Sequence, residues 1–355
     1  MTKVNSKFWK GKKVFITGHT GFKGSWLSLW LQSMGAEIKG FSLAPHTSPS
    51  LFYEANVGEK MESVFGDIRD KDCVFDSMIQ FNPDVIFHMA AQPLVRASYR
   101  EPIDTYSTNI MGTLNVLEGA RYCSNLKAVV NVTTDKCYAN NEWDWGYREN
   151  EPMGGFDPYS SSKACSELVT SAYRSSFFKK SGIAVATARA GNVIGGGDWS
   201  EDRLIPDILN AFVNKKPVVI RNPNSIRPWQ HVLEPLSGYL ILAEKLFVNG
   251  QSFAEGWNFG PYDQDVQTVL WIVEKMTSDW NHKENWKIDS DEQPHEANYL
   301  KLDISKAKNL LGWKPSWDLT VTIDKIIKWH QSWISGTNAQ ALCLAQINEF
   351  QNRVI

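Results

Sequence analysis

Short apolar segments alternate with longer helical patterns from the start of this 355-residue chain as far as Arg189. The apolar segments are predicted to be buried strands, and the stretches between them are predicted to be helices. Strands that alternate with helices in this way pair in parallel, with the helices covering both faces of the sheet. The sequence therefore predicts an α/β fold with strands at 13–17, 37–42, 61–66, 84–89, 128–133 and 184–189.

Breaker and capping residues bound the helical patterns. Apolar spacing predicts one helix over 21–34, and a second over 70–80 ends before the breaker Asn82-Pro83. A longer helix is predicted over 102–122. A further helix is expected to follow Pro158, because proline is favoured in the first helical turn.

A glycine-rich turn joins the first predicted strand to the first predicted helix. Glycines let the backbone turn tightly and approach a pyrophosphate, whose charge is favoured at a helix N-terminus. The alternative, a glycine-rich turn without a ligand, is disfavoured by the strand before it and the helix after it. The spacing G-x-x-G-x-x-G therefore predicts a dinucleotide site at Gly18, Thr20, Gly21, Phe22, Lys23 and Gly24.

The adenosine end of this site is less clearly marked. The second strand ends in Gly40-Phe-Ser-Leu-Ala44, without an acidic residue for the ribose of NAD and without an arginine for the 2′-phosphate of NADP. Ser42 or His46 could contact either cofactor. Asp67 and Ile68, after the third strand, are placed to hold adenine, and a helix cap is the alternative of about equal weight.

Tyr159 and Lys163 are four residues apart, so they lie one turn apart on the same face of a helix. An ammonium there can stabilise the phenolate, since a nearby positive charge favours the ionised form. The phenolate could then take a hydroxyl proton while a nicotinamide takes the hydride. The alternative is a tyrosine packed on the core with a solvated lysine. The dinucleotide motif upstream favours the catalytic interpretation.

The character of the sequence changes after Asn192, where glycines, tryptophans, prolines and shorter strands become frequent. Residues 1–191 are predicted to form an NAD-binding, Rossmann-type domain with a doubly wound parallel sheet. A late strand near 257–260 is expected to join that sheet. Residues 192–355 are predicted to form mostly a smaller C-terminal α/β substrate domain.

Charge and cysteine pattern disfavour several other classes of protein. The 37 basic and 39 acidic residues give a formal charge of −2, which provides no footprint for a nucleic acid. The five cysteines form no C-x-x-C pair, so reduced thiols are expected rather than disulfides or a zinc site, and no metal is predicted. The N-terminal segment lacks an apolar signal-peptide core and no window approaches a membrane span. A cytoplasmic protein is expected.

Six motifs, in order, resemble the nucleotide-sugar branch of the extended short-chain dehydrogenase/reductase superfamily. They cover nearly the whole chain: Thr17–Gly24, Gly66–Asp70, His88–Gln92, Tyr159–Lys163, Arg189–Gly195 and Ile226–Val232. The segments Leu43–Phe52 and Thr133–Tyr138 are most similar to the CDP-D-glucose 4,6-dehydratases of bacterial surface-polysaccharide synthesis. The resemblance implies NAD as cofactor and adds Ala90, Ala91, Tyr159 and Lys163 to its contacts.

The resemblance also implies a lyase that converts CDP-D-glucose to CDP-4-dehydro-6-deoxy-D-glucose and water. The reaction oxidises C4, removes water across C5 and C6, and returns the hydride to C6. Tyr159 would take the C4 hydroxyl proton, supported by Thr134, while Lys163 would lower the pKa of Tyr159 and hold the nicotinamide ribose.

For the dehydration step the resemblance implicates Asp135 and Lys136. Asp135 matches the position that protonates the departing C6 hydroxyl, so burial should keep it protonated near neutral pH. Lys136 replaces the glutamate of dTDP-glucose dehydratases and would remove the C5 proton. That role requires burial or neighbouring cations to lower the pKa of the lysine. Alternatively, Lys136 pairs with a carboxylate and orders the site.

The predicted substrate contacts also follow from the resemblance. Arg227 matches the diphosphate-binding arginine, Asn192 and Arg203 match pocket positions, and Gln92 is expected near sugar hydroxyls. Tyr299 is a further candidate that could instead be a packing residue. A homodimer or homotetramer is implied, formed through a helix bundle of 102–122 and 159–179. Competing hypotheses are a nucleotide-sugar 4-epimerase, a dTDP- or GDP-sugar dehydratase, and a non-catalytic NAD sensor.

Overall fold

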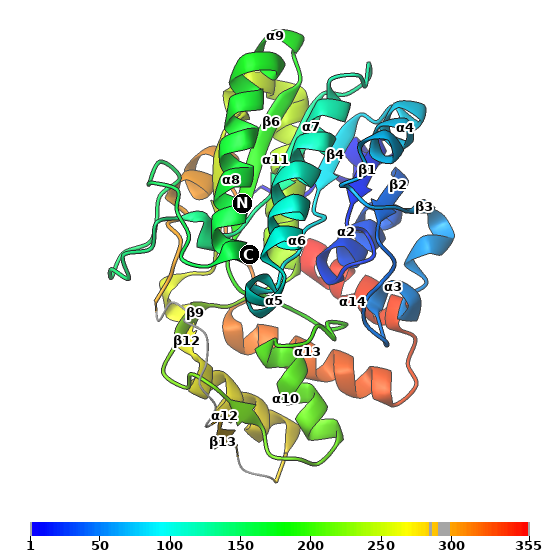
Figure 1. Ribbon diagram of the computed structural model, residues 1–355. Coiled ribbons are helices and arrows are strands. Elements are labelled where there is room, and N and C mark those ends of the chain that lie inside the picture. The colour runs from blue at the N-terminus through cyan, green and yellow to red at the C-terminus, as the bar shows by residue number, and fades with distance from the viewer. Residues whose placement is uncertain (1, 284–285, 290–298, 354–355) are drawn as a thin grey trace.

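A single seven-stranded parallel sheet forms the centre of the computed structural model, which describes residues 2–283, 286–289 and 299–353 (Figure 1). The strand order is β11-β6-β5-β4-β1-β2-β3, with every neighbouring pair parallel. This confirms the predicted doubly wound sheet, including the late strand beside β6. The strands are β1 (Lys13–Thr17), β2 (Glu37–Ser42), β3 (Glu62–Phe65), β4 (Val85–His88), β5 (Ala128–Val132), β6 (Ala184–Ala190) and β11 (Gly256–Phe259).

Helices cover both faces of this sheet because both faces of its strands are apolar. Neighbouring residues of a strand point to opposite faces, so Phe15 and Ile16 belong to different hydrophobic clusters. The cluster around Ile16 includes residues of α2 (Phe22–Ser33), α11 (Leu233–Asn249) and α14 (Ala339–Asn352). The cluster around Phe15 includes residues of α4 (Lys71–Phe81) and α7 (Thr113–Ala120), with α8 (Pro158–Tyr173) packed beside them.

The helix predicted over 102–122 is one continuous run with an internal irregularity. It consists of α6 (Pro102–Tyr106), a π-helical turn (Ser107–Gly112) and α7. Inside the π-helical turn, the side-chain amide of Asn109 donates to the backbone carbonyl of Gln92 at 3.1 Å and to Ser162 Oγ at 2.9 Å. The irregular turn thereby ties this helix to the loop after β4 and to α8.

A smaller unit lies beyond the carboxyl ends of the sheet strands, at the bottom of Figure 1. Its helices α10 (Leu204–Val213), α12 (Val269–Trp280) and α13 (Leu319–Ile334) enclose a separate hydrophobic cluster. Its strand pairs are β7 (Val193–Ile194) with β10 (Gln230–His231), β8 (Val219–Ile220) with β13 (Lys287–Ile288), and β9 (Ile226–Pro228) with β12 (Val266–Thr268).

The C-terminal half also contributes to the sheet domain, since β11, α11 and α14 all pack there. The division at residue 191 stays a prediction. None of the described helices has the length and apolar character to cross a membrane. The remaining short elements are α1 (Ser6–Trp9), α3 (Leu51–Glu54), α5 (Val95–Arg100), α9 (Lys179–Ser181), the 3₁₀ turns Val57–Lys60, Asp135–Cys137, Gly250–Phe253 and Asp263–Asp265, and the π turns Arg174–Phe178 and Ala307–Leu311.

Candidate active site

One cavity of about 670 Å³ opens between the carboxyl ends of the sheet strands and the smaller unit. This volume is in the range of a cofactor or small-molecule site. All but two of the predicted site residues line it, the exceptions being Lys163 and Tyr299. The lining includes Gly18, Thr20, Gly21, Phe22, Lys23, Gly24, Asp67, Ile68, Ala90, Ala91, Gln92, Thr134, Asp135, Lys136, Tyr159, Asn192, Arg203 and Arg227.

The glycine-rich turn after β1 has the geometry of a dinucleotide cradle. Gly18 has φ +79°, and a Cβ there would lie 2.7 Å from the Ala90 nitrogen. A Cβ on Gly24 would lie 2.0 Å from the Gly18 carbonyl oxygen. A side chain at Gly18 would therefore clash with the loop after β4, and a side chain at Gly24 would clash with the backbone of the turn itself. The turn leads from β1, which lies between β2 and β4 in the sheet, into the N-terminus of α2. The strand order reverses at this point, and dinucleotides bind at such a point in doubly wound sheets.

The predicted adenine contacts Asp67 and Ile68 line the other end of this cradle. Oδ2 of Asp67 accepts from Arg69 Nε at 2.9 Å and from Arg69 Nη2 at 2.6 Å, and hydrogen bonds from Arg69 lower the pKa of Asp67. The alternative that Asp67 caps a helix is wrong, because the N-cap of α4 is Asp70, which accepts from the Cys73 amide. Arg69 is therefore a further residue at this end, with no signal in the sequence for its pairing.

The N-terminus of α8 fixes the positions of Tyr159 and Lys163. Asp157 caps the helix by accepting from the Ser160 amide at 2.9 Å, and Pro158 occupies its first turn. Tyr159 is only 8% exposed and lines the cavity. Lys163 is also buried, and its Nζ donates to the Val132 carbonyl at 3.0 Å. The alternative of a solvated lysine is therefore excluded.

The predicted effect of Lys163 on the pKa of Tyr159 stays a prediction, because burial is the largest influence on that pKa. Burial raises the pKa of Tyr159 to about 12, and a hydrogen bond with Thr134 is the main opposing influence. The ammonium of Lys163 is directed at Val132, and burial lowers the pKa of Lys163 to about 8 against the raising effect of Glu167. A phenolate near neutral pH therefore needs a further positive charge beside Tyr159.

Asp135 and Lys136 lie in a short 3₁₀ turn directly after β5. Asp135 is 2% exposed, and its Oδ2 has no hydrogen-bond partner among the described residues. Burial raises the pKa of Asp135, in the direction expected for an acid that keeps its proton. Lys136 is half-buried beside it and lines the cavity, and its positive charge partly offsets the effect of burial on the pKa of Asp135, so both the role as base and the alternative of a lysine that pairs with a carboxylate stay open.

The predicted substrate contacts line the cavity from separate segments of the chain. Arg227 is 6% exposed and lies near enough to Asp135 to lower the pKa of that carboxyl. Arg203 donates to Asp198 at 3.1 Å. The side chain of Gln92 is used within the protein, since its amide donates to Thr105 at 2.8 Å and accepts from the Leu94 amide at 2.6 Å. Gln92 therefore shapes the loop after β4 as well as lining the cavity.

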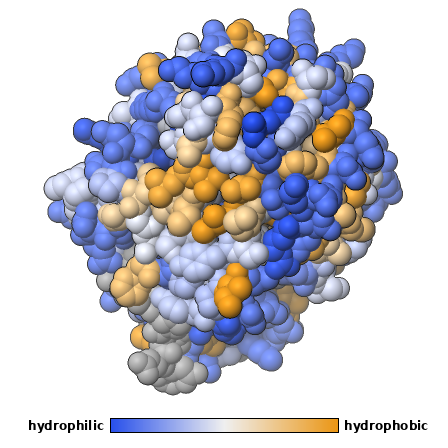
Figure 2. Space-filling model, turned by 45° about the horizontal axis from the view of Figure 1, so that its top comes forward, coloured by the Kyte–Doolittle hydropathy of each residue, from blue (hydrophilic) through white to orange (hydrophobic). Residues whose placement is uncertain are grey.

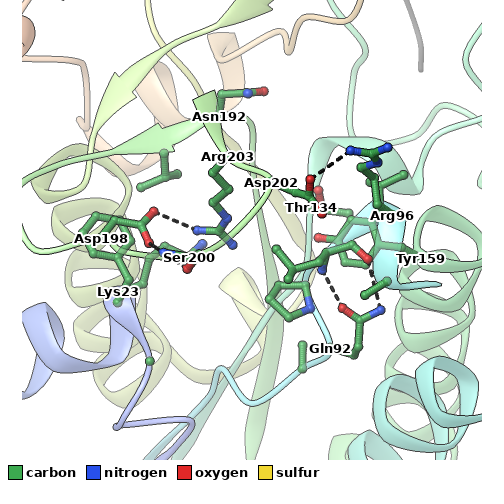
Figure 3. Close-up of a pocket in the computed structure, with 18 of the residues that line it drawn as sticks. Lys23, Gln92, Arg96, Thr134, Tyr159, Asn192, Asp198, Ser200, Asp202 and Arg203 are labelled. Atoms are coloured by element: carbon green, nitrogen blue, oxygen red, sulfur yellow. Dashed lines mark hydrogen bonds and ion pairs between the residues drawn. The ribbon is translucent and has the colours of Figure 1, made fainter. Parts of the chain in front are cut away.

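A second group of charged residues in the cavity was not predicted. Figure 3 shows Arg96, from α5, reaching Asp202 in the loop before α10. Asp202 accepts from Arg96 at 2.9 Å and from Arg221 at 2.8 Å. The cavity thus holds several arginines, as expected for a diphosphate site. No sequence pattern indicates these pairs, because they join segments far apart in the chain.

Tyr299 does not lie with the other substrate candidates. Its hydroxyl donates to the Asp144 carbonyl at 3.5 Å, and its own carbonyl accepts from Asn140 at 3.0 Å. Its predicted substrate role is corrected to packing against the loop between β5 and α8. In the same loop, Trp143 stacks on Trp145 with ring centroids 4.9 Å apart, and Trp145 is 60% exposed.

Lys23, predicted only as a cofactor contact, also belongs to the catalytic end. Burial lowers the pKa of Lys23 to about 7, helped by the charges of Lys163 and Arg203 and opposed by Asp135. The unfolded chain, with the ordinary value of 10.5, binds more protons in the interval between these values. Stability should therefore rise with pH from 7 to 10.5 through this group.

We expect Lys23→Met to stabilise the protein most below pH 7, with a gain that shrinks as pH rises toward 10.5. Denaturant unfolding at about pH 6 and about pH 9 measures this difference. Lys7→Met, at an exposed position, is the matched control and should show no such pH dependence. Equal gains at both pH values would contradict the buried, destabilised ammonium.

Comparison with known proteins identifies the family. The GDP-mannose 4,6 dehydratase family model matches residues 15–326. A CDP-glucose 4,6-dehydratase from Salmonella typhimurium is 57% identical over 354 residues, covering 98% of this chain and 99% of that protein. A dTDP-glucose 4,6-dehydratase from Haemophilus influenzae is 27% identical and covers 89% of this chain and 97% of its own.

Solved structures show the same fold. A dTDP-glucose 4,6-dehydratase from Bacillus anthracis, in complex with NAD, has a TM-score of 0.77 at 21% identity, covering 93% of this chain and 100% of that one. A UDP-glucose 4-epimerase from Thermotoga maritima, with UDP-glucose, has a TM-score of 0.79 at 20% identity, covering 91% and 99%. With the family match spanning most of its length, the chain belongs to the GDP-mannose 4,6 dehydratase family of nucleotide-sugar enzymes.

Proposed function

We propose that this chain converts CDP-D-glucose into CDP-4-dehydro-6-deoxy-D-glucose and water, with NAD as its cofactor. The observation that carries the proposal is one cavity that brings Tyr159, Asp135 and Lys136 together beside a glycine cradle. An epimerase needs Tyr159, whereas only a dehydratase also needs a proton donor and acceptor there. The Salmonella relative at 57% identity supports CDP-glucose as the substrate.

The residues around Tyr159 serve the oxidation at C4. Bound NAD would accept the C4 hydride and later return it to C6. Tyr159 removes the proton of the C4 hydroxyl, and the Thr134 hydroxyl, which donates to Asp135 at 3.0 Å, lies close enough to favour the phenolate. Lys163, held by the Val132 carbonyl, would supply positive charge and a hydrogen-bond donor to the cofactor. Gly18, Gly24 and the start of α2 would hold the pyrophosphate.

Asp135 and Lys136 serve the loss of water. The 4-keto group acidifies the C5 proton, which Lys136 takes as the general base. The electron pair of the C5–H bond forms the C5–C6 double bond as the C6–O bond breaks. Asp135, whose pKa burial raises, gives its proton to the leaving hydroxyl so that water departs. Arg203 and Arg227 bind the diphosphate of the substrate.

Incubation with CDP-D-glucose and mass spectrometry test this function directly. The expected product is lighter than the substrate by one water, with no net reduction of added NAD. A 4-epimerase would give a product of unchanged mass, and a non-catalytic sensor would give none. A panel of CDP-, dTDP-, UDP- and GDP-sugars identifies the nucleotide. Faster turnover of another nucleotide would overturn the choice of CDP.

We also propose that the chain forms a homodimer or homotetramer through α6, α7 and α8. These helices lie side by side at the front of Figure 1, and Figure 2 shows hydrophobic side chains gathered across the middle of this face. Ile103 is 83% exposed, Leu168 58% and Met111 50%. Such a cluster of exposed apolar side chains is typical of an interface between subunits.

Ile103→Glu and Leu168→Glu should convert the assembly to monomers, because a charge would be buried at the interface. Light scattering coupled to size-exclusion chromatography measures the mass. Val248→Glu, at an apolar position 71% exposed at the end of α11, is the control and should leave the mass unchanged. A wild-type monomer would contradict the proposal.

A cytoplasmic location is proposed from the cysteines, all five of which are free thiols. We also propose that the product is a precursor of deoxysugars, including those of O-antigen, and the resemblance to enzymes of bacterial surface-polysaccharide synthesis supports this.

A further inference from the structure

A buried ion pair lies directly behind the turn that carries Asp135 and Lys136. Arg189 of β6 donates to Glu167 of α8 through Nε and Nη2, each at 2.8 Å. Both side chains are almost fully buried, 6% and 5% exposed. Burial alone would raise the pKa of Glu167, but the charge and hydrogen bonds of Arg189 hold it below its ordinary value. Glu167 therefore stays ionised.

The same carboxylate holds the residue that precedes the turn. Thr133, the first residue after β5, donates from Oγ1 to Glu167 Oε1 at 2.5 Å. Thr187 of β6 donates to the other oxygen, Oε2, at 2.7 Å. Glu167 thus accepts from two threonines, of which only Thr133 adjoins the Thr134–Cys137 segment.

The arginine of the pair holds the residue that follows the turn. Arg189 Nη1 donates to the Tyr138 hydroxyl at 2.6 Å and to the Glu149 carbonyl at 3.0 Å. The Tyr138 hydroxyl in turn donates to Asn258 Oδ1 at 2.8 Å. Tyr138 is 1% exposed, so this contact is shielded from water. One ion pair thereby fixes both ends of a four-residue segment.

We propose that Glu167 and Arg189 are positioning residues for the dehydration step. The inference rests on the proposed function, because it concerns the two groups that remove water. Tyr159 and Lys163 stand on α8 itself and are held by the helix cap and by Val132. The positions of Asp135 and Lys136 depend on the short turn, which the ion pair holds through its hydrogen bonds with Thr133 and Tyr138. Loss of either hydrogen bond should therefore slow the dehydration step more than the oxidation step.

A buried ion pair is a costly way to hold a turn, since both charges must be desolvated. The guanidinium of Arg189 presents several donors in a fixed plane and can bind two segments at once, and this geometry offsets the cost of desolvation. A small displacement of a catalytic group can lower the rate of its step by about a hundredfold. The fixed plane of Arg189 thus suits a turn whose two catalytic side chains act in one step.

Isosteric variants that remove the hydrogen bond at Thr133 or at Tyr138 test the proposal. Thr133→Val and Tyr138→Phe each remove one hydrogen bond to the ion pair, and Tyr138 does not line the cavity. Thr187→Val is the matched control, because it removes a comparable buried bond from the same carboxylate without touching the turn. Thr133→Ser restores the hydroxyl.

Kinetic isotope effects with substrate deuterated at C4 or at C5 distinguish the two steps. For Thr133→Val and Tyr138→Phe we expect turnover to fall about tenfold, with a larger C5 effect and a smaller C4 effect, since proton removal from C5 becomes limiting. Thr187→Val and Thr133→Ser should keep the wild-type ratio. Equal behaviour of Thr133→Val and Thr187→Val would overturn the proposal.

A second readout does not depend on catalysis. Backbone amide hydrogen exchange over 134–138 should be faster in Thr133→Val than in Thr187→Val, with similar exchange elsewhere on α8. No acceleration over 134–138 would overturn the positioning role. If the wild-type enzyme did not dehydrate CDP-D-glucose, the proposed function would fail, and this measurement would still decide whether the ion pair holds the turn.

Discussion

Tyr159→Phe should lower turnover of CDP-D-glucose by about 10²- to 10⁴-fold, the range that a positioned general base contributes. The substitution removes only the hydroxyl that takes the C4 proton. The phenyl ring should keep its place, because Tyr159 is 8% exposed at the start of a capped helix. Steady-state kinetics measure the loss, which should fall on the turnover number more than on the Michaelis constant.

Tyr239→Phe is the matched control for this variant. Tyr239 is fully buried and is not among the residues that line the cavity, and its hydroxyl has no hydrogen-bond partner among the described residues. Removing that hydroxyl should leave turnover near wild type. A Tyr159→Phe enzyme with most of its activity would remove Tyr159 as the base and leave the oxidation step without an acceptor for the C4 proton.

Local patterns in the sequence were sufficient to predict the sheet and the cofactor cradle. The strands are buried on both faces, so their apolar runs stand out against amphipathic helices. Gly24 is required by a close backbone contact with Gly18 in the same turn, and Gly18 by its positive φ and its contact with Ala90, so a fixed glycine spacing records the cradle. The spacing of Tyr159 and Lys163 likewise lies within one helix.

Contacts between distant segments could not be predicted in the same way. Arg96 and Asp202 are separated by 106 residues, and Glu167 and Arg189 by 22. No periodicity records such pairs. The acidity of Tyr159 also depends on burial and on where the Lys163 ammonium points, and neither can be read from a four-residue spacing, so the predicted effect of Lys163 stays a prediction. Tyr299 was misplaced because the loop between β5 and α8 binds it.

Lys136→Met should abolish most dehydration while C4 oxidation continues. Methionine keeps the length of the side chain but cannot take the C5 proton, so product formation should fall by about 10²- to 10⁴-fold. Under single-turnover conditions in deuterated water, the 4-keto sugar should accumulate with its original hydrogen at C5. Deuterium at C5 would assign the proton transfer to another group. Lys23 would then be the first candidate, because burial lowers its pKa to about 7 and it lies near Asp135.

Asp135→Asn should slow the departure of the C6 hydroxyl while removal of the C5 proton continues. The amide keeps the shape of the carboxyl but has no acidic proton to give to the leaving hydroxyl, so water loss should slow by a similar factor. Lys136 is intact in this variant, so the 4-keto sugar should exchange its C5 hydrogen with solvent while keeping its C6 hydroxyl. Exchange in Asp135→Asn and none in Lys136→Met would assign base and acid to separate residues. Loss of exchange in both variants would mean that proton removal and water loss occur together, with the two side chains acting as one unit.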